Sequence, residues 1–153
     1  REVEKLAIEL GPQARITAEE VEAAAAHSSE RQVWGLVDSL VAGDGPAATR
    51  AFLQLRGQGE SVARLAPLLA RRVREVLAIA LRLGEGEAPP QIKATLKMNP
   101  WAADRRIVEA RGSDPDRLRR ALEDLAVLEL ATHGASELSD DTEAVRAIVR
   151  IAA

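Results

Sequence analysis

Apolar residues recur at every third or fourth position along almost the whole chain. Leu, Val, Ile and Ala at this spacing lie on one face of an α-helix. The segments with this pattern are separated by Gly, Pro, Asp, Asn and Ser, which favour helix ends and turns. Alternation of β-branched and polar residues is missing, so we expect no strand. The pattern therefore predicts an all-α protein built as a helical bundle.

The N-terminal part of the chain predicts two short helices. Residues 2–10 place Leu6 and Leu10 on one face, and Gly11-Pro12 follows as a helix stop. Thr17 and Glu20 then have the spacing of a capping box, in which each side chain accepts a backbone N–H of the first helical turn. His27-Ser28-Ser29 comes next and is the best boundary in the sequence. It divides the chain into a piece over residues 1–27 and a domain over residues 28–153.

The remaining segments predict a series of helices with clear start signals. Asp44, Asn99 and Asp114 each precede a Pro by one or two residues, as N-caps do. The expected helices cover residues 31–42, 46–56, 61–83, 90–97, 100–111, 115–132 and a last stretch that ends at 152. Residues 61–83 have the widest apolar face, which suits a central helix contacted from several directions. Pro67 either kinks this helix or marks its true start.

Composition narrows the range of functions. The 21 Lys and Arg residues face 24 Asp and Glu residues, and a net charge of −3 gives no support for a nucleic-acid or anionic-membrane binder. The absence of Cys excludes disulfides, thiolate nucleophiles and Cys-based metal sites, and it fits a reducing cytoplasm. No apolar run of 18 residues exists, so no membrane span is expected. The arginines at 71, 72 and 74 and at 117, 119 and 120 are interpreted as solvated faces.

Side chains suited to catalysis are scarce. His27 and His133 lie where helices should end, and a His there usually binds the last carbonyls. Asp140, Asp141 and Glu143 lie at a helix start, where negative charge is favourable. No phosphate-binding loop and no metal-binding His pair is present in the sequence. We therefore expect no catalytic residue, no cofactor site and no metal site, and a protein that is not an enzyme.

One segment suggests a function of its own. Residues 90–111 combine a short helix, a brief turn and a second helix that carries Arg105, Arg106 and Arg111. This order resembles a helix-turn-helix, in which the second helix enters the major groove of DNA. Trp101 sits early in the second helix, where polar residues that read bases are expected. A DNA-binding regulator that uses residues 90–111 is therefore the alternative function.

Taken in order, several segments resemble the C-terminal part of the bacterial DNA polymerase III delta subunit family. EVEKL followed by ITAEEV near the N-terminus resembles the end of that family's lid domain, which is of the AAA+ type. VWGLVDSLVAGD (33–44) resembles the entry to its collar domain. LLARRVREVL (68–77) resembles its long collar helix, and IKATLKMNPWAADRRIVEARG (92–112) resembles the segment after it. Thr132-His133-Gly134 departs from the family, which has a Lys before this Gly.

The resemblance implies a scaffold in the clamp loader of DNA replication. In that family the collar joins the collars of the tau/gamma and delta-prime subunits in a five-subunit ring. An N-terminal domain, which we expect to be missing from this chain, contacts the sliding clamp, and primed DNA is bound by the assembled complex. The resemblance therefore implies a collar fold preceded by two lid helices, and a cytoplasmic, non-catalytic role in clamp loading without contact to a membrane.

An oligomerising bundle should expose more apolar surface than its own core can cover. The broad face of residues 61–83 and the apolar residues of 145–152 are the candidates for this surface. Both stretches could equally fill the core of the chain itself, and the sequence does not distinguish a core role from an interface role. The candidate interface residues are Leu69, Arg71, Val73, Arg74, Val145, Ile148 and Val149.

Overall fold

The computed structural model describes residues 32–152, and every regular element in this range is a helix. A first helix covers residues 32–42. The others are α3 (Gly45–Gly57), α4 (Val62–Gly84), α5 (Pro89–Thr95), α6 (Pro100–Arg111), α7 (Pro115–Leu130), the π-helical turn η1 (Ala131–Ala135) and α8 (Asp140–Ala152). The all-α prediction is confirmed for this range. The expected helices before residue 27, the boundary at 27/28 and His27 lie outside the described residues.

The predicted N-caps are present. The Asp44 carboxylate accepts a hydrogen bond from the backbone N–H of Ala47 at 2.9 Å, and the Asn99 side chain accepts one from Ala102 at 2.8 Å. Asp114 accepts from the N–H of Asp116 at 3.0 Å. Each bond satisfies one of the backbone donors that the first helical turn leaves without an intrahelical partner. Local side-chain chemistry thus sets where α3, α6 and α7 begin.

Pro67 does not start α4. The helix begins at Val62, after Ser61, whose hydroxyl accepts from the N–H of Arg64 at 3.2 Å. Pro67 lies inside the helix and cannot donate to the carbonyl four residues earlier. Its position is exposed, so water can take the place of the missing donor.

The expected helix over residues 115–132 ends differently. The α-helical part of α7 stops at Leu130, and residues 131–135 form a π-helical turn. Gly134 has φ +93°, a conformation that L-residues with a side chain rarely adopt, so the chain leaves the helix at this glycine. The His133 ring nitrogen Nδ1 lies 2.8 Å from the Glu129 carbonyl, as expected of a His at a helix end.

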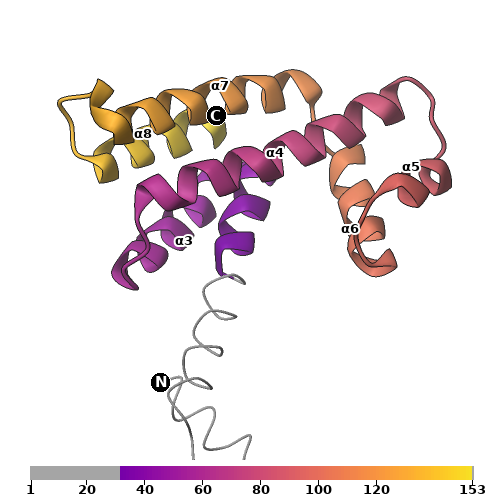
Figure 1. Ribbon diagram of the computed structural model, residues 1–153, viewed down its shortest axis with the longest axis horizontal. Helices are drawn as coiled ribbons and strands as arrows, with labels where there is room; N and C mark the ends of the chain where they lie inside the picture. Colours follow the sequence, from indigo (N-terminus) through magenta and orange to yellow (C-terminus); the bar gives the residue numbers. More distant parts are fainter. Residues whose placement is uncertain (1–31, 153) are drawn as a thin grey trace, which may run out of the picture.

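α4 is the central element of the bundle (Figure 1). It packs most extensively against α7 and also contacts α5, α6 and α8, while α8 packs against α3 and α7. The predicted central position of this helix is confirmed. α5 and α6 lie together at the end of the molecule where α4 finishes, away from the α3 end (Figure 1).

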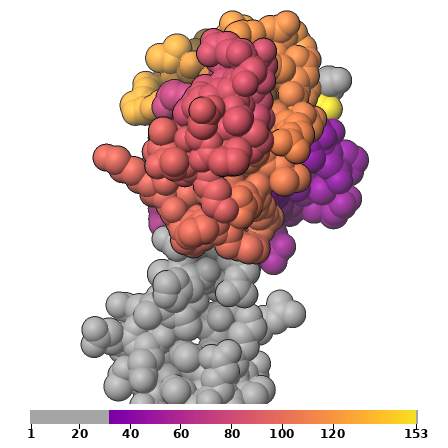
Figure 2. Space-filling view, turned by 90° about the vertical axis from the view of Figure 1, so that its right-hand side faces the viewer, coloured from indigo at the N-terminus to yellow at the C-terminus, as the bar shows by residue number. Residues whose placement is uncertain are grey.

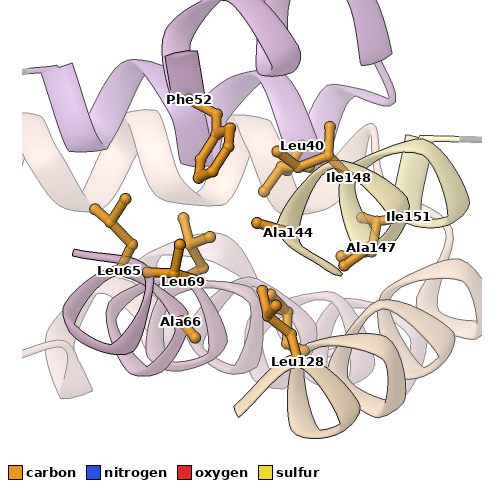
Figure 3. A pocket seen from close by; sticks show the side chains of 12 residues that line it. Leu40, Phe52, Leu65, Ala66, Leu69, Leu128, Ala144, Ala147, Ile148 and Ile151 are labelled. Atoms are coloured by element: carbon orange, nitrogen blue, oxygen red, sulfur yellow. The ribbon is translucent and has the colours of Figure 1, made fainter. Parts of the chain in front are cut away.

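Core side chains of the first helix, α3, α4, α7 and α8 meet around one small gap. Figure 3 shows Phe52, Leu65, Leu69, Leu128 and Ile148 turned toward a common centre. The gap that they enclose has a volume of about 10 Å³, which is at the lower limit of the space that a single water needs. Because its lining is apolar, a water there would have no hydrogen-bond partner. This gap is core packing and offers no ligand chamber.

Candidate interaction surface

The structure divides the seven candidate interface residues into two groups. Leu69, Val73 and Ile148 have exposed fractions of 3%, 1% and 3% and belong to the core cluster. They lie on the side of α4 or α8 that faces the rest of the bundle. Neighbouring helices of the same chain cover these three residues, so they serve as core residues of this fold.

The other four candidates reach the surface to different degrees. Arg71, Arg74 and Val149 are exposed, and Val145 is half-buried against the core. Within the part of the chain that the structure describes, Arg71 has one long ion pair, with Glu75 on the same helix at 3.4 Å. Arg74 has no ion-pair partner among residues 32–152. These side chains are available to a partner, and their role at an interface stays a prediction.

Arg72 is buried, although the sequence placed it on a solvated face. Its exposed fraction is 4%, and its Nη2 donates to Glu109 at 2.8 Å and to Asp38 at 3.3 Å. The guanidinium carbon also lies 5.6 Å from the centre of the Trp34 ring, a cation–π distance. Position 72 falls one turn from Leu69 and Val76, and two turns from Leu65, on the buried side of α4. Helical periodicity could therefore have predicted that Arg72 is buried. The prediction was missed because Arg72 was grouped with Arg71 and Arg74, which are exposed.

The ion pairs of Arg72 belong to a network that joins three helices. Arg105 of α6 donates to Asp38 at 2.7 Å, and Arg106 donates to Glu75 of α4 at 2.7 Å. The helix over residues 32–42, α4 and α6 are thus tied by charges of alternating sign. Burial raises the pKa of Glu109, and the adjacent Arg72 guanidinium only partly opposes this effect.

Arg117 is the second arginine that the sequence misplaced. It is half-buried, and its guanidinium donates to the carbonyls of Leu40 and Val41 at the end of the first helix. It also donates to the Ile151 carbonyl at the end of α8, at 3.5 Å. Helix ends leave carbonyls without intrahelical donors, and a cation there also interacts favourably with the helix dipole. Arg117 therefore holds two helix ends against α7.

α6 carries an exposed ridge on the side that faces away from the bundle. Trp101 and Val108 have exposed fractions of 70% and 68%, and Arg105 lies between them with its guanidinium carbon 5.8 Å from the Trp101 ring centre. These three residues, Trp101, Arg105 and Val108, are called the α6 ridge below. Figure 2 looks onto this end of the molecule, where α5 and α6 form the surface.

Comparison with known proteins identifies the family. Residues 30–137 match the family described as "DNA polymerase III delta subunit, C-terminal domain". The chain belongs to this family.

A curated protein and a solved structure are also similar to this chain. The chain is 26% identical over 129 residues to the DNA polymerase III subunit delta of Bacillus subtilis; the match covers 84% of this chain and 37% of that protein. Its fold is similar to the solved structure of the Bacillus subtilis DNA clamp loader delta protein, with a TM-score of 0.71 and 22% identity. That alignment covers 99% of this chain and 44% of the other. The chain thus spans less than half the length of these relatives.

The delta-family assignment replaces the helix-turn-helix interpretation. Two of the three arginines proposed to read DNA, Arg105 and Arg106, are engaged by carboxylates of other helices. The comparisons give no support to a regulator that uses residues 90–111. The physical reason is that a short helix, a turn and a second helix recur in any bundle, so this order alone does not specify DNA reading.

Neither a metal-binding cluster nor a membrane-spanning helix is found in the described part of this delta-family chain. Within residues 32–152, no group of three His, Asp or Glu side chains is placed to hold a metal ion. In the same range no helix combines the length and hydropathy needed to cross a bilayer. Asp140, Asp141 and Glu143 occupy the first turn of α8, where Asp141 pairs with Arg56 of α3.

Proposed function

We propose that this chain is the scaffold region of a clamp-loader delta subunit, whose collar-type bundle assembles with other subunits. The observation that carries the proposal is the match of residues 30–137 to the delta C-terminal family. A rigid helical body supports it, since the buried arginine network joins α4 and α6 to the first helix. In this proposal the bundle contributes position and contact surface, and it carries out no reaction.

The partners in this proposal are the tau/gamma and delta-prime subunits, which bind through the collar. Primed DNA is met only in the assembled complex, and the sliding clamp only through a domain outside this chain. The proposed division of the chain is a lid piece over residues 1–27 and the collar over residues 28–153, and the proposed location is the cytoplasm. Among the predicted contact residues, Arg71, Arg74 and Val149 are the exposed ones.

Co-elution tests the proposal. The chain is mixed with purified gamma-type and delta-prime subunits of the same bacterium and run on a size-exclusion column. We expect it to elute with them in one complex, and to bind a fluorescent DNA duplex weakly when it is alone. Failure to co-elute with either subunit would contradict the scaffold role. Tight duplex binding by the lone chain, with the steep salt dependence of phosphate contacts, would favour a DNA-binding protein instead.

A further inference from the structure

α6 is apolar on two faces. Ala103, Ile107 and Ala110 are buried on the inner face, while Trp101 and Val108 lie seven residues apart on the outer face. Among the exposed large hydrophobic residues of 32–152, these two have the largest exposed fractions. Single exposed apolar side chains are common on monomers. A Trp and a Val on the same face of one helix, with an Arg between them, form a continuous ridge.

Two grooves flank the α6 ridge. One lies toward α5 and is lined by Pro89, Pro90, Val108 and Arg111, among others. The second lies toward the first helix and has Val41, Ala42 and Val108 in its wall. Val108 therefore stands between the two grooves, and each groove is lined by apolar side chains together with charged ones. Helices pack against each other by placing ridges of side chains into grooves, so this surface has a shape that a second helix can pack against.

The charges around the ridge favour an acidic occupant. The carboxylates that line the two grooves are already paired: Asp104 with Lys93 at 2.6 Å, Asp38 with Arg105 at 2.7 Å and Glu109 with Arg72 at 2.8 Å. Arg111 lines the α5 groove and has no ion-pair partner among the described residues. The carboxylates of this surface are thus neutralised by ion pairs, whereas the positive charge of Arg111 is not.

We infer that the α6 ridge is a docking surface for a helical segment of a partner subunit. That segment would place apolar side chains around Trp101 and Val108 and an Asp or Glu opposite Arg111. Trp and Arg are among the residue types that are enriched in the few interface positions that dominate binding energy. A second copy fits less well, because a two-fold contact would use the same face of both chains, and the carboxylates that line its grooves are already paired and leave none for Arg111. The inference rests on the proposed function.

Paired substitutions test the inference. Trp101→Ser with Val108→Ser removes the ridge, and Val127→Ser with Leu130→Ser on α7 is the control, since it removes two exposed apolar side chains elsewhere. Binding of each variant to the gamma-type and delta-prime subunits is measured by titration. We expect the ridge variant to bind about tenfold or more weakly, and the control to bind as the unaltered chain does. Both variants should stay folded, with unchanged unfolding midpoints, because the replaced side chains are exposed.

A second readout locates the contact. With Trp34→Phe, Trp101 becomes the sole tryptophan, and its emission should shift to shorter wavelength when the subunits are added. Arg111→Glu should weaken binding, and less so at high salt. Full binding by the ridge variant, or equal losses in ridge variant and control, would overturn the inference while leaving the scaffold role intact.

The remaining outcomes distinguish other occupants. Failure of the unaltered chain to bind either subunit would remove the proposed function and this inference with it. Self-association of the lone chain that the ridge variant abolishes, measured by sedimentation equilibrium, would assign the face to a second copy and overturn the inference. Binding of a dT20 oligonucleotide that the ridge variant loses would assign it to single-stranded nucleic acid, with the same consequence.

Discussion

At the scale of single residues, Arg72 has the most unusual environment in the described chain. It is a buried cation held by Asp38, Glu109 and the Trp34 ring. Its Nε and Nη1 atoms and the Glu109 Oε1 atom are buried without a hydrogen-bond partner. Removing charges from water costs several kcal/mol per ion, so a partly satisfied network of this kind contributes little net stability. Breaking it by removing one member is nevertheless expensive, because the remaining charges stay buried.

Arg72→Ala should therefore destabilise the fold by about 3 kcal/mol. This value is at the lower end for a broken buried ion pair, because Glu109 can take up a proton. Arg71→Ala is the matched control, since Arg71 is the preceding residue and is exposed; its effect should stay within about 0.5 kcal/mol. Urea unfolding followed by circular dichroism measures both. Equal effects of the two substitutions would contradict the burial of Arg72.

Glu109 gives a pH-dependent prediction. Because burial raises its pKa in the folded state, the folded chain binds this proton more tightly than the unfolded chain does. The stability contributed by Glu109 is then fully present below its unfolded pKa and is lost as pH rises through the folded pKa. Glu109→Gln keeps a neutral side chain at every pH. The unfolding free energy of this variant, relative to the unaltered chain, should increase from about pH 4 to pH 7.

The pKa of Asp141 is shifted in the opposite direction from that of Glu109, so its effect on stability has the opposite dependence on pH. The hydrogen bond from Arg56 lowers the pKa of this carboxyl. Its contribution is therefore present above the unfolded pKa and disappears as pH falls through the folded one. Asp141→Asn should flatten the acid limb of the stability curve, whereas Glu109→Gln should not. If both variants changed the curve in the same direction, at least one of these assignments would be wrong.

At the scale of elements, helix ends are defined by side chains that act locally or across the bundle. Asn99 is the local case, because it caps the helix that it precedes. Asn99→Ala should cost about 1 kcal/mol, the usual loss for an N-cap. Asn99→Asp keeps an acceptor at the same place and should retain most of the stability. Thermal unfolding of the two variants measures the difference, and equal losses would mean that the cap hydrogen bond is unimportant.

Arg117 is the case that acts across the bundle. It lies on α7 but binds carbonyls at the ends of the first helix and α8. Arg117→Ala should cost about 2 kcal/mol, as expected for hydrogen bonds to a charged group that also satisfies helix ends. Hydrogen exchange should show faster opening at the ends of both helices. Arg119→Ala is the control, since Arg119 is exposed and its ion-pair partner among the described residues is nearby Asp116.

At the scale of the whole molecule, the core formed by residues 32–152 is one cluster to which every long helix in this range contributes. Adjacent residues of α8 show how sharply its boundary runs: Ile148 has an exposed fraction of 3% and Val149 one of 58%. Ile148→Asp should unfold the chain, because a lone buried carboxylate has no compensating partner. Val149→Asp should fold normally. Circular dichroism and the thermal midpoint distinguish the two, and a folded Ile148→Asp variant would contradict the packing of α8.

The sequence alone was sufficient for most features that depend on neighbouring residues. The caps at Asp44, Asn99 and Asp114 were predicted correctly because a cap involves residues within a few positions. The helix end at Gly134 was also predicted from the sequence. The change from α-helix to π-helix just before this glycine was not predicted. The family resemblance came from the order of several short segments, which no single helix pattern could supply.

The chain pattern by itself therefore determined the helical class, most helix boundaries and the central place of α4, because these follow from periodicity and local hydrogen bonding. The tertiary structure decided which apolar residues are covered and which arginines are buried. Leu69 and Ile148 could have faced a partner until other helices were seen to cover them. Arg72 resembled its solvated neighbours because its partners, Asp38 and Glu109, lie 34 and 37 residues away in sequence. Contacts across such distances depend on how the helices pack against each other.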